Sequence, residues 1–148
     1  MKTLRHFITI FFCGLSLASI GQNLQASTFV ERTHVSPKFG SSLGYQWDNQ
    51  IELGGFYQTA QENAGVSEHR RRWMEREFYG IYFNYPMIGY AKANVKLNIR
   101  TGVVNGETFI ITPGVLAHYS PIKQITVGAG LGTRTMRPTY RASLMINL

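Results

Sequence analysis

The sequence predicts an all-β fold, a closed antiparallel up-and-down barrel of eight strands. Three observations lead to this prediction. Apolar and polar residues alternate along much of the chain with the period of two that a β-strand shows. Short turn-forming sequences separate the alternating segments. No segment keeps a helical period over the length that a helix needs to cover a sheet.

The N-terminal segment predicts export. Two basic residues precede an apolar run over residues 7–20, and Ala26 closes a cleavage site. A positive start, an apolar stretch shorter than the roughly 20 residues of a membrane-spanning helix and a small-residue exit are typical of a secretory signal peptide. We therefore expect residues 1–26 to be a signal peptide and residues 27–148 to form a single barrel domain.

The composition of the exported part narrows the class of protein. Loss of Lys2 and Arg5 reduces the 15 basic residues to 13, against 8 acidic residues, so the net charge is +5. The single cysteine, Cys13, lies in the signal segment, and the barrel domain therefore has no disulfide. No run of 18 apolar residues follows the signal segment, so the sequence predicts no membrane-spanning helix in the barrel domain.

The first three predicted strands differ in how clearly they alternate. Residues 39–47 and 50–59 each place large apolar side chains on one face and glycine or polar side chains on most of the other. An eighth strand can come only from residues 27–35. This segment fits neither register, because Glu31 falls on one face and Arg32 on the other.

The central strands include the clearest pattern in the chain. In residues 91–99 every odd position is apolar, and the even positions from 92 to 100 are all polar or charged. A helix cannot keep such a pattern on one stripe, because its period is 3.6 residues. Residues 78–85 are aromatic on both faces, and we expect Tyr79, Ile81, Phe83 and Tyr85 to form the outer set.

The last three strands complete a meander. Residues 108–119, 124–134 and 140–148 all alternate, although Pro113 removes one ladder hydrogen bond. A longer loop is expected over residues 61–72. The other expected connections are short: Asp48-Asn49, Pro86-Met87, Asn105-Gly106, Pro121-Ile122-Lys123 and Met136-Arg137-Pro138.

Two architectures share this alternation, a soluble barrel with an apolar interior and a membrane barrel with an apolar exterior. Much of the polar face is glycine, which a narrow interior requires and a solvent-exposed face does not. Apolar-face aromatics also gather at two rims, as the interfacial girdles of a membrane barrel do. One rim holds Phe39, Tyr57, Phe109 and Tyr140, and the other holds Tyr45, Trp47, Phe83, Tyr85 and Tyr119. We therefore expect a transmembrane β-barrel.

The signal peptide, the meander, the two girdles and the alternating final strand over residues 140–148 resemble the small eight-stranded outer-membrane barrels of the OmpA, OmpX and opacity-protein type. That family commonly ends on an aromatic residue, whereas this chain ends on Leu148. The resemblance implies a bacterial outer-membrane location with both termini in the periplasm. It also implies outer-membrane lipid, lipopolysaccharide and the barrel-assembly machinery as partners.

Two candidate sites follow from this reading. The interior is expected to hold a polar cluster, with a structural role favoured over a conducting pore because eight strands leave space only for side chains. Its members are Glu52, Lys92, Lys96, Arg100, His118 and Arg141. A basic outer loop of His69, Arg70, Arg71 and Arg72 is a candidate for binding lipopolysaccharide phosphates, since arginine contacts phosphate through two hydrogen bonds. An ordinary solvated loop is an equal alternative.

No catalytic or metal site is predicted. His118 and Ser120 are similar to the His-x-Ser of barrel deacylases, but Pro121 and Gly132 replace the residues expected to follow. The histidines are too scattered to ligate a metal, and we expect no cofactor and no nucleic-acid partner.

The favoured function is a non-enzymatic outer-membrane barrel that contributes to envelope integrity or to surface and lipopolysaccharide interaction. Two alternatives stay open. One is a narrow, anion-preferring diffusion channel, and the other is a soluble periplasmic β-barrel that binds a small apolar ligand.

Overall fold

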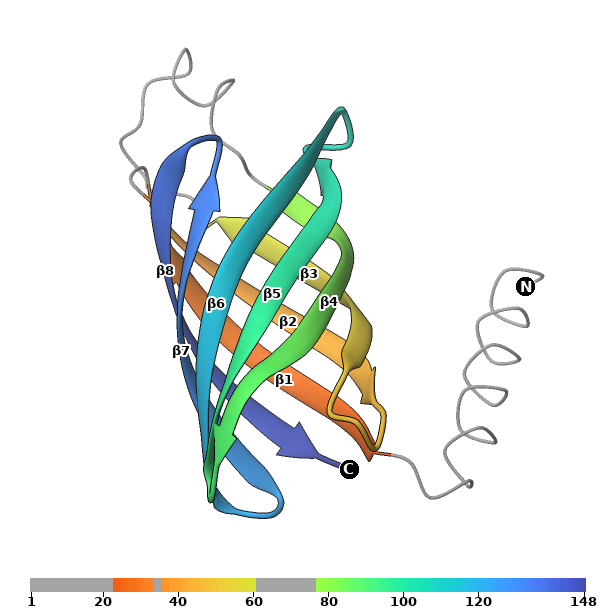
Figure 1. Ribbon diagram of the computed structural model, residues 1–148. Coiled ribbons are helices and arrows are strands. Elements are labelled where there is room, and N and C mark those ends of the chain that lie inside the picture. The colour runs from red at the N-terminus through yellow and green to blue at the C-terminus, as the bar shows by residue number, and fades with distance from the viewer. Residues whose placement is uncertain (1–22, 34–35, 61–76) are drawn as a thin grey trace, which may run out of the picture.

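The chain folds into an antiparallel β-barrel (Figure 1). The computed structural model describes residues 23–33, 36–60 and 77–148. Eight strands lie within these ranges: β1 (Asn23–Arg32), β2 (Pro37–Gln46), β3 (Glu52–Ala60), β4 (Glu77–Tyr90), β5 (Ala93–Val104), β6 (Thr108–Ile122), β7 (Ile125–Arg134) and β8 (Arg137–Asn147).

Each strand pairs with its neighbours in the chain, and β1 also pairs with β8, which closes the barrel. The closing register places Glu31 opposite Arg141 and Ala26 opposite Ile146. Closure leaves no unpaired sheet edge, so every strand has hydrogen-bonding partners on both sides. The predicted fold class is confirmed.

The two ends of the barrel are built differently (Figure 1). The start of β1 and the C-terminus share the lower end, where the Leu148 amide donates to the Leu24 carbonyl over 2.8 Å. The β2–β3, β4–β5 and β6–β7 turns lie at this end. At the upper end β7 and β8 meet in a two-residue turn at Thr135 and Met136, both in the left-handed region with φ of 50° and 62°. Residues 61–76, outside the described part of the chain, connect β3 to β4 at the upper end.

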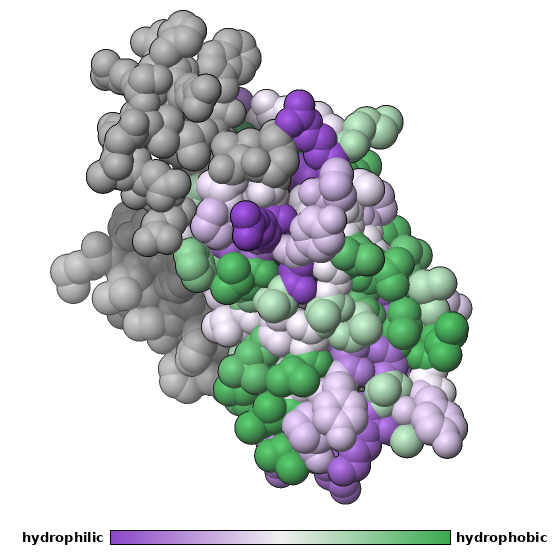
Figure 2. Space-filling view, turned by 90° about the vertical axis from the view of Figure 1, so that its left-hand side faces the viewer, coloured by the Kyte–Doolittle hydropathy of each residue, from purple (hydrophilic) through white to green (hydrophobic). Residues whose placement is uncertain are grey.

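The strands point most of their apolar side chains outward and their charged side chains mainly inward, although a few aromatic rings, such as Phe78, are buried inside. Ile81 and Leu131 are 57% and 62% exposed, whereas Glu31 and Glu52 are completely buried. Figure 2 shows one side of the barrel, where hydrophobic side chains gather across the middle and hydrophilic ones lie toward the ends. In the described residues, no helix has the length and apolar character needed to cross a membrane.

Aromatic side chains form two rims on the outer face. Phe39, Tyr57, Tyr79, Phe109 and Tyr140 lie toward the upper end and are exposed. Trp47, Phe83, Tyr85, Tyr90 and Tyr119 lie toward the lower end and are exposed as well. Membrane barrels place aromatic rings at these two levels, where one part of the ring meets lipid and another meets water.

The first strand differs from the prediction in its position. β1 begins at Asn23, so the predicted cleavage after Ala26 falls inside the strand. Its register is also clear: Gln25, Phe29 and Glu31 are buried, and Val30 is exposed. Glu31 did not fit a simple alternation of apolar and polar residues, because it is a charged interior residue whose partners are arginines far along the sequence.

The β4–β5 turn also differs from the prediction. A turn was expected at Pro86-Met87, but β4 continues to Tyr90. The proline sits at a bulge, where the register shifts between Pro86 and Ile88, and a bulge is one of the few places that a strand tolerates proline. The chain reverses at Ala91, which has a φ of 49°.

Candidate functional site in the barrel interior

The upper part of the interior is organised around one carboxylate. We call Glu31, Arg100, Arg134 and Arg141 the upper cluster. Arg100 Nη2 donates a hydrogen bond to Glu31 Oε2. Arg141 Nη2 lies 3.5 Å from the same oxygen, and Arg134 Nη1 lies 3.7 Å from Glu31 Oε1. Four strands, β1, β5, β7 and β8, are therefore joined through a single side chain.

Aromatic rings surround these guanidinium groups. The Arg134 guanidinium carbon lies 4.2 Å from the centre of the Phe78 ring, and that of Arg141 lies 4.3 Å from the centre of Phe29. Phe56 packs edge-on against Phe78 with 4.7 Å between ring centres. A cation over a ring face is attracted by the ring quadrupole, and the attraction is strongest away from water. The rings thus help to hold a charge excess that one carboxylate cannot neutralise.

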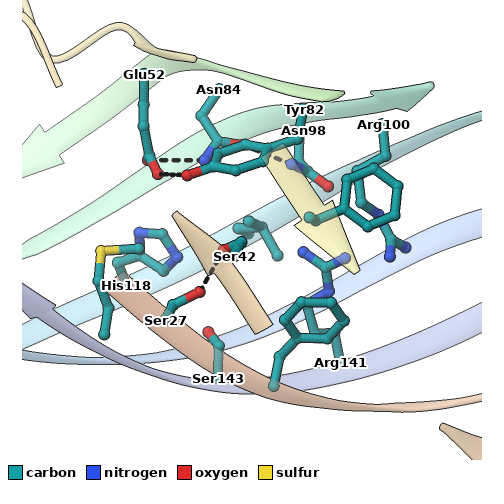
Figure 3. A pocket seen from close by; sticks show the side chains of 14 residues that line it. Ser27, Ser42, Glu52, Tyr82, Asn84, Asn98, Arg100, His118, Arg141 and Ser143 are labelled. Carbon is teal, nitrogen blue, oxygen red and sulfur yellow. Dashed lines mark hydrogen bonds between the residues drawn. The ribbon is translucent and has the colours of Figure 1, made fainter. Parts of the chain in front are cut away.

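The lower part of the interior is a hydrogen-bonded network of mostly neutral groups (Figure 3). We call Glu52, Tyr82, Asn84, Lys96 and Asn98 the lower cluster. The Tyr82 hydroxyl donates to Glu52 Oε1 over 2.5 Å, and Asn84 Nδ2 donates to Oε2 over 2.8 Å. Lys96 Nζ lies 3.6 Å from Oε2. Asn98 Nδ2 donates to Asn84 Oδ1 over 2.6 Å, which extends the network to β5.

A glycine leaves the space that the lower cluster occupies. Gly44 on β2 faces inward, and a Cβ added there would overlap the Tyr82 hydroxyl and come within 3.2 Å of Glu52 Oε1. The absence of a side chain at position 44 allows the Tyr82 hydroxyl on β4 to reach Glu52 on the neighbouring strand β3. This explains one of the interior glycines in terms of a particular contact.

Between the two clusters the interior is almost filled. A cavity of about 20 Å³ is lined by residues of both clusters, by His118 and by Ser27, Ser42 and Ser143 (Figure 3). That volume accommodates about one water molecule. His118 is 4% exposed, and its Nε2 atom has no hydrogen-bond partner among the described residues. At this height the described side chains therefore leave room for little more than one water molecule.

Comparisons with known proteins bear on the fold. No protein-family model and no curated protein sequence matches this chain. A de novo designed transmembrane β-barrel matches with a TM-score of 0.68 and 9% identity over 85% of this chain and 95% of the other. The N-terminal β-barrel domain of OprF from Pseudomonas aeruginosa matches with a TM-score of 0.57 and 12% identity, over 85% and 97% of the chains.

The outer-membrane protein Ail from Yersinia pestis also matches, with a TM-score of 0.56 and 8% identity, over 86% of this chain and 99% of that one. This chain has the fold of the small eight-stranded outer-membrane β-barrels. The matches span nearly the whole length of those barrels, and the eight strands and closed order of this barrel agree with them.

In this outer-membrane-type barrel, most of the predicted interior residues do lie inside. Glu52, Lys96, Arg100 and His118 are buried, and the Arg141 side chain is 11% exposed. They are divided between two clusters, however, and do not form one group. Their expected structural role stays a prediction.

Lys92 is a correction to the predicted interior set. It lies in the exposed β4–β5 turn, where its Nζ donates to the Pro121 carbonyl over 3.1 Å. The alternation that placed it inside holds only from β5 onward, because the backbone reverses at Ala91 and position 92 no longer follows the pleat.

Three charged interior residues were not predicted as such. Glu31 fitted neither register of its strand, and Lys38 and Arg134 were not in the predicted interior set, yet all three are buried. One signal pointed to Glu31: a predicted interior with four basic residues and one acid needs further carboxylates, because an unpaired buried charge is costly. Every second residue of β2 and β7 faces the interior. This alternation extends to Lys38 and Arg134, so it would also have placed them inside.

The predicted basic loop of His69, Arg70, Arg71 and Arg72 lies outside the described residues. Within the described residues, no group of three or more potential metal ligands occurs.

The chemistry available to the interior is that of charge pairing. Glu31 and Glu52 are engaged with several donors each, and Ser120 Oγ shares a hydrogen bond of 2.7 Å with Thr126 Oγ1, so that it is not directed at His118. A nucleophilic mechanism requires nucleophile, base and orienting group in contact. The described interior instead joins strands across the barrel.

Proposed function

We propose that this chain is a non-enzymatic protein of the bacterial outer membrane that contributes to envelope integrity as a closed barrel and through contact with lipopolysaccharide. The observation that carries the proposal is the combination of an apolar exterior with a charge-paired, nearly filled interior. An apolar exterior suits a bilayer, and a filled interior suits a structural barrel better than a diffusion channel.

The distribution of side chains opposes the soluble alternative. A soluble barrel that binds a small apolar ligand needs an apolar interior and a polar exterior. Here Glu31, Glu52 and Lys96 are buried, whereas Leu43 and Ile81 are more than half exposed. Placed in water, this exterior would present an apolar surface far larger than monomeric soluble proteins tolerate.

The orientation follows from the lengths of the connections. Membrane barrels have short periplasmic turns and longer outer loops. The turns at the lower end are short, whereas residues 61–76 join β3 to β4 at the upper end. These lengths support a periplasmic location of the termini and a cell-surface location of the upper end, and on that orientation the basic segment from His69 to Arg72 is the proposed contact with lipopolysaccharide.

Two measurements test the proposal. Outer-membrane fractions should contain the protein, and the unboiled protein should migrate differently from the boiled protein on a denaturing gel, because a closed barrel resists detergent. Purified, refolded protein should give no steady conductance in a planar bilayer. Release with the soluble periplasmic fraction would overturn the membrane location, and open-channel currents would overturn the closed barrel.

A narrow anion-preferring channel is the second candidate, and one observation favours it. The interior holds five basic side chains, Lys38, Lys96, Arg100, Arg134 and Arg141, against the two acids Glu31 and Glu52. This excess would attract anions if the side chains moved apart. Currents that reverse at the chloride equilibrium potential would support this candidate over the closed barrel.

The contact with lipopolysaccharide has its own test. Replacing Arg70, Arg71 and Arg72 together by glutamine should lower the affinity of the refolded protein for lipopolysaccharide, since each arginine can make charge-assisted contacts with phosphate. The matched control is Lys123→Gln at the opposite end. Unchanged affinity in the triple variant would exclude this segment as the contact.

A further inference from the structure

The outer face of the barrel has a groove over β1, β2 and β3. Over β1, β2 and β3 the outward positions include Ala26, Thr28, Ser41 and Gly55, all small side chains in neighbouring strands. They line a groove of about 650 Å³, which larger side chains such as Leu43 and Leu144 border. Small residues alone do not make a site, but this groove lies in the apolar belt of the barrel.

The wall formed by β4, β5 and β6 carries more large outward side chains, as Ile81, Phe83, Ile99 and Val115 illustrate, although Thr101 and Ala117 are small. The strands there are also longer, with 14 residues in β4 and 15 in β6 against 10 in β2 and 9 in β3. The groove over β1–β3 thus lies in the shorter-stranded wall of the barrel.

Among the described residues of the upper rim, exposed basic and acidic side chains lie over different strands. Arg32, at the upper end of β1, points outward, because Glu31 and Thr33 on either side of it are buried. It pairs in register with Tyr140, a residue of the upper aromatic rim, and Arg137 is exposed at the start of β8. The exposed acids Glu77 and Glu107 lie instead at the upper ends of β4 and of the β5–β6 hairpin.

The groove and the arginine lie at heights that suit one amphiphile. From Arg32 down to Ala26 the chain advances six residues along β1. At about 3.3 Å per residue and a strand tilt of roughly 40°, this corresponds to a descent of about 15 Å. Half the hydrocarbon thickness of a bilayer is also about 15 Å. A phosphate at Arg32 would thus have its acyl chain in the groove, within one leaflet.

We propose that the outer face of β1–β3, with Arg32 above it, is a binding site for lipid A of lipopolysaccharide, in which Arg32 contacts a phosphate and the groove takes an acyl chain. Arginine can grip phosphate through two parallel hydrogen bonds. The commitment to lipid A rests on the proposed membrane location and orientation, because lipid A occupies the outer leaflet, at the upper end of the barrel.

Two variants test the site. Gly55→Leu fills the groove without disturbing the barrel, because a Cβ added at Gly55 meets only the Gly80 carbonyl oxygen at 3.8 Å. Arg32→Gln removes the charge. The matched controls are Ala117→Leu, on the outer face of β6, and Lys123→Gln, at the lower end. Refolded proteins in detergent are titrated with purified bisphosphorylated lipid A, and the bound fraction is read by native mass spectrometry.

We expect Gly55→Leu and Arg32→Gln each to weaken lipid A binding at least fivefold, and both controls to bind like the original protein. The same titration with phosphatidylethanolamine and phosphatidylglycerol should show weaker binding and no dependence on Gly55. Equal binding of lipid A and phospholipid would overturn the assignment to lipid A. Unchanged binding in both variants would overturn the site, as would a dimer that Gly55→Leu dissociates, because a second copy would then be the occupant.

Failure of the lipid A site can be distinguished from failure of the proposed function. Heat-modifiable migration and presence in the outer-membrane fraction are measured on the same variants. If these persist while lipid A binding does not depend on Gly55 or Arg32, the lipid site fails and the membrane barrel stands. If the original protein does not enter the outer membrane, the proposed function fails first.

Discussion

The upper and lower clusters bury charge in opposite ways. In the upper cluster one carboxylate, Glu31, serves three guanidinium groups, and aromatic rings line the remaining faces of the cations. In the lower cluster one carboxylate, Glu52, is surrounded mainly by neutral donors, and Lys96 is its one cationic partner among the described residues. The comparison indicates that one narrow barrel can bury an excess of cations in one cluster and a hydrogen-bonded anion in the other.

The two arrangements differ in how much depends on one side chain. Neutral donors around Glu52 can find other acceptors, since asparagine and tyrosine carry acceptors and donors of their own. Arginine has donors only and stays charged at physiological pH. Loss of Glu31 would therefore leave three buried cations close together, whereas loss of the Glu52 charge leaves one.

The largest effect is expected for Glu31→Gln. This change keeps the size of the side chain and removes the negative charge that Arg100, Arg134 and Arg141 share. Breaking a buried ion pair by removing one partner costs about 3–5 kcal/mol. The free energy of unfolding, measured by urea titration in lipid vesicles, should fall by that amount. A loss below about 1 kcal/mol, the range of exposed ion pairs, would show that the upper cluster is hydrated and not a dry charge network.

A smaller effect is expected for Glu52→Gln. The glutamine carbonyl can still accept the hydrogen bond from Asn84, and its amide nitrogen, in place of Oε1, can donate to the Tyr82 hydroxyl oxygen, so only Lys96 loses its charge partner. The expected loss is about 1–3 kcal/mol, the cost of leaving one buried polar group without its partner.

A double variant sharpens this comparison. Glu52→Gln combined with Lys96→Met should recover most of the stability that Glu52→Gln loses, because the unpaired cation is then gone. Glu31→Gln combined with Arg100→Met should recover little, since Arg134 and Arg141 have still lost the Glu31 charge. Equal recovery in both pairs would mean that the two clusters bury charge in the same way.

Gly44→Ala is expected to have a more limited effect that is confined to the lower cluster. The added methyl group displaces the Tyr82 hydroxyl from Glu52, and overpacking of this kind costs about 1–2 kcal/mol. Combining it with Tyr82→Phe, which removes the displaced hydroxyl, should lower the cost. An equal loss in both proteins would place the strain elsewhere than at the hydroxyl.

The last prediction, with the smallest expected effect on the barrel, concerns the residue at which the mature chain begins. β1 includes Asn23 to Ala26, and Gln25 Nε2 donates to Gln46 Oε1 over 2.6 Å. We expect the exported protein to begin before Asn23, and the sequence Ser19-Ile20-Gly21 supplies a small-residue exit for cleavage. Intact-mass measurement of the mature protein should give a chain that starts at Gln22. A chain that starts at Ser27 would show that β1 is four residues shorter in the mature barrel.

Much of the fold could be predicted because a pleat has a period of exactly two in its side-chain directions. Residues 91–99 and 140–148 alternated cleanly, so both strands and their outward sets followed from the sequence, and the structure confirms the eight-stranded barrel. Strand ends were less predictable. Pro86 indicated a turn, but a bulge kept β4 paired beyond it, since a bulge needs no donor at that position.

The interior site could be predicted only in part. The alternation along residues 91–99 and its continuation placed Lys96 and Arg100 inside, but it could not identify the acidic side chains that pair with them. Glu31 contradicted a simple alternation of apolar and polar residues, because the interior side of β1 carries both Phe29 and a carboxylate. The division into two clusters depends on the height of each residue in the closed barrel, which requires the register between strands.

The sequence by itself determined that this chain forms strands in a meander, which side chains share a face, and which of those faces carries most of the lysine and arginine. These properties are local, because the pleat and the turns act over a few residues. Only the tertiary structure decided the charge partners. Glu31 meets Arg100 across 69 positions and Arg141 across 110, and only closure of the β1–β8 edge brings them to one height in the barrel.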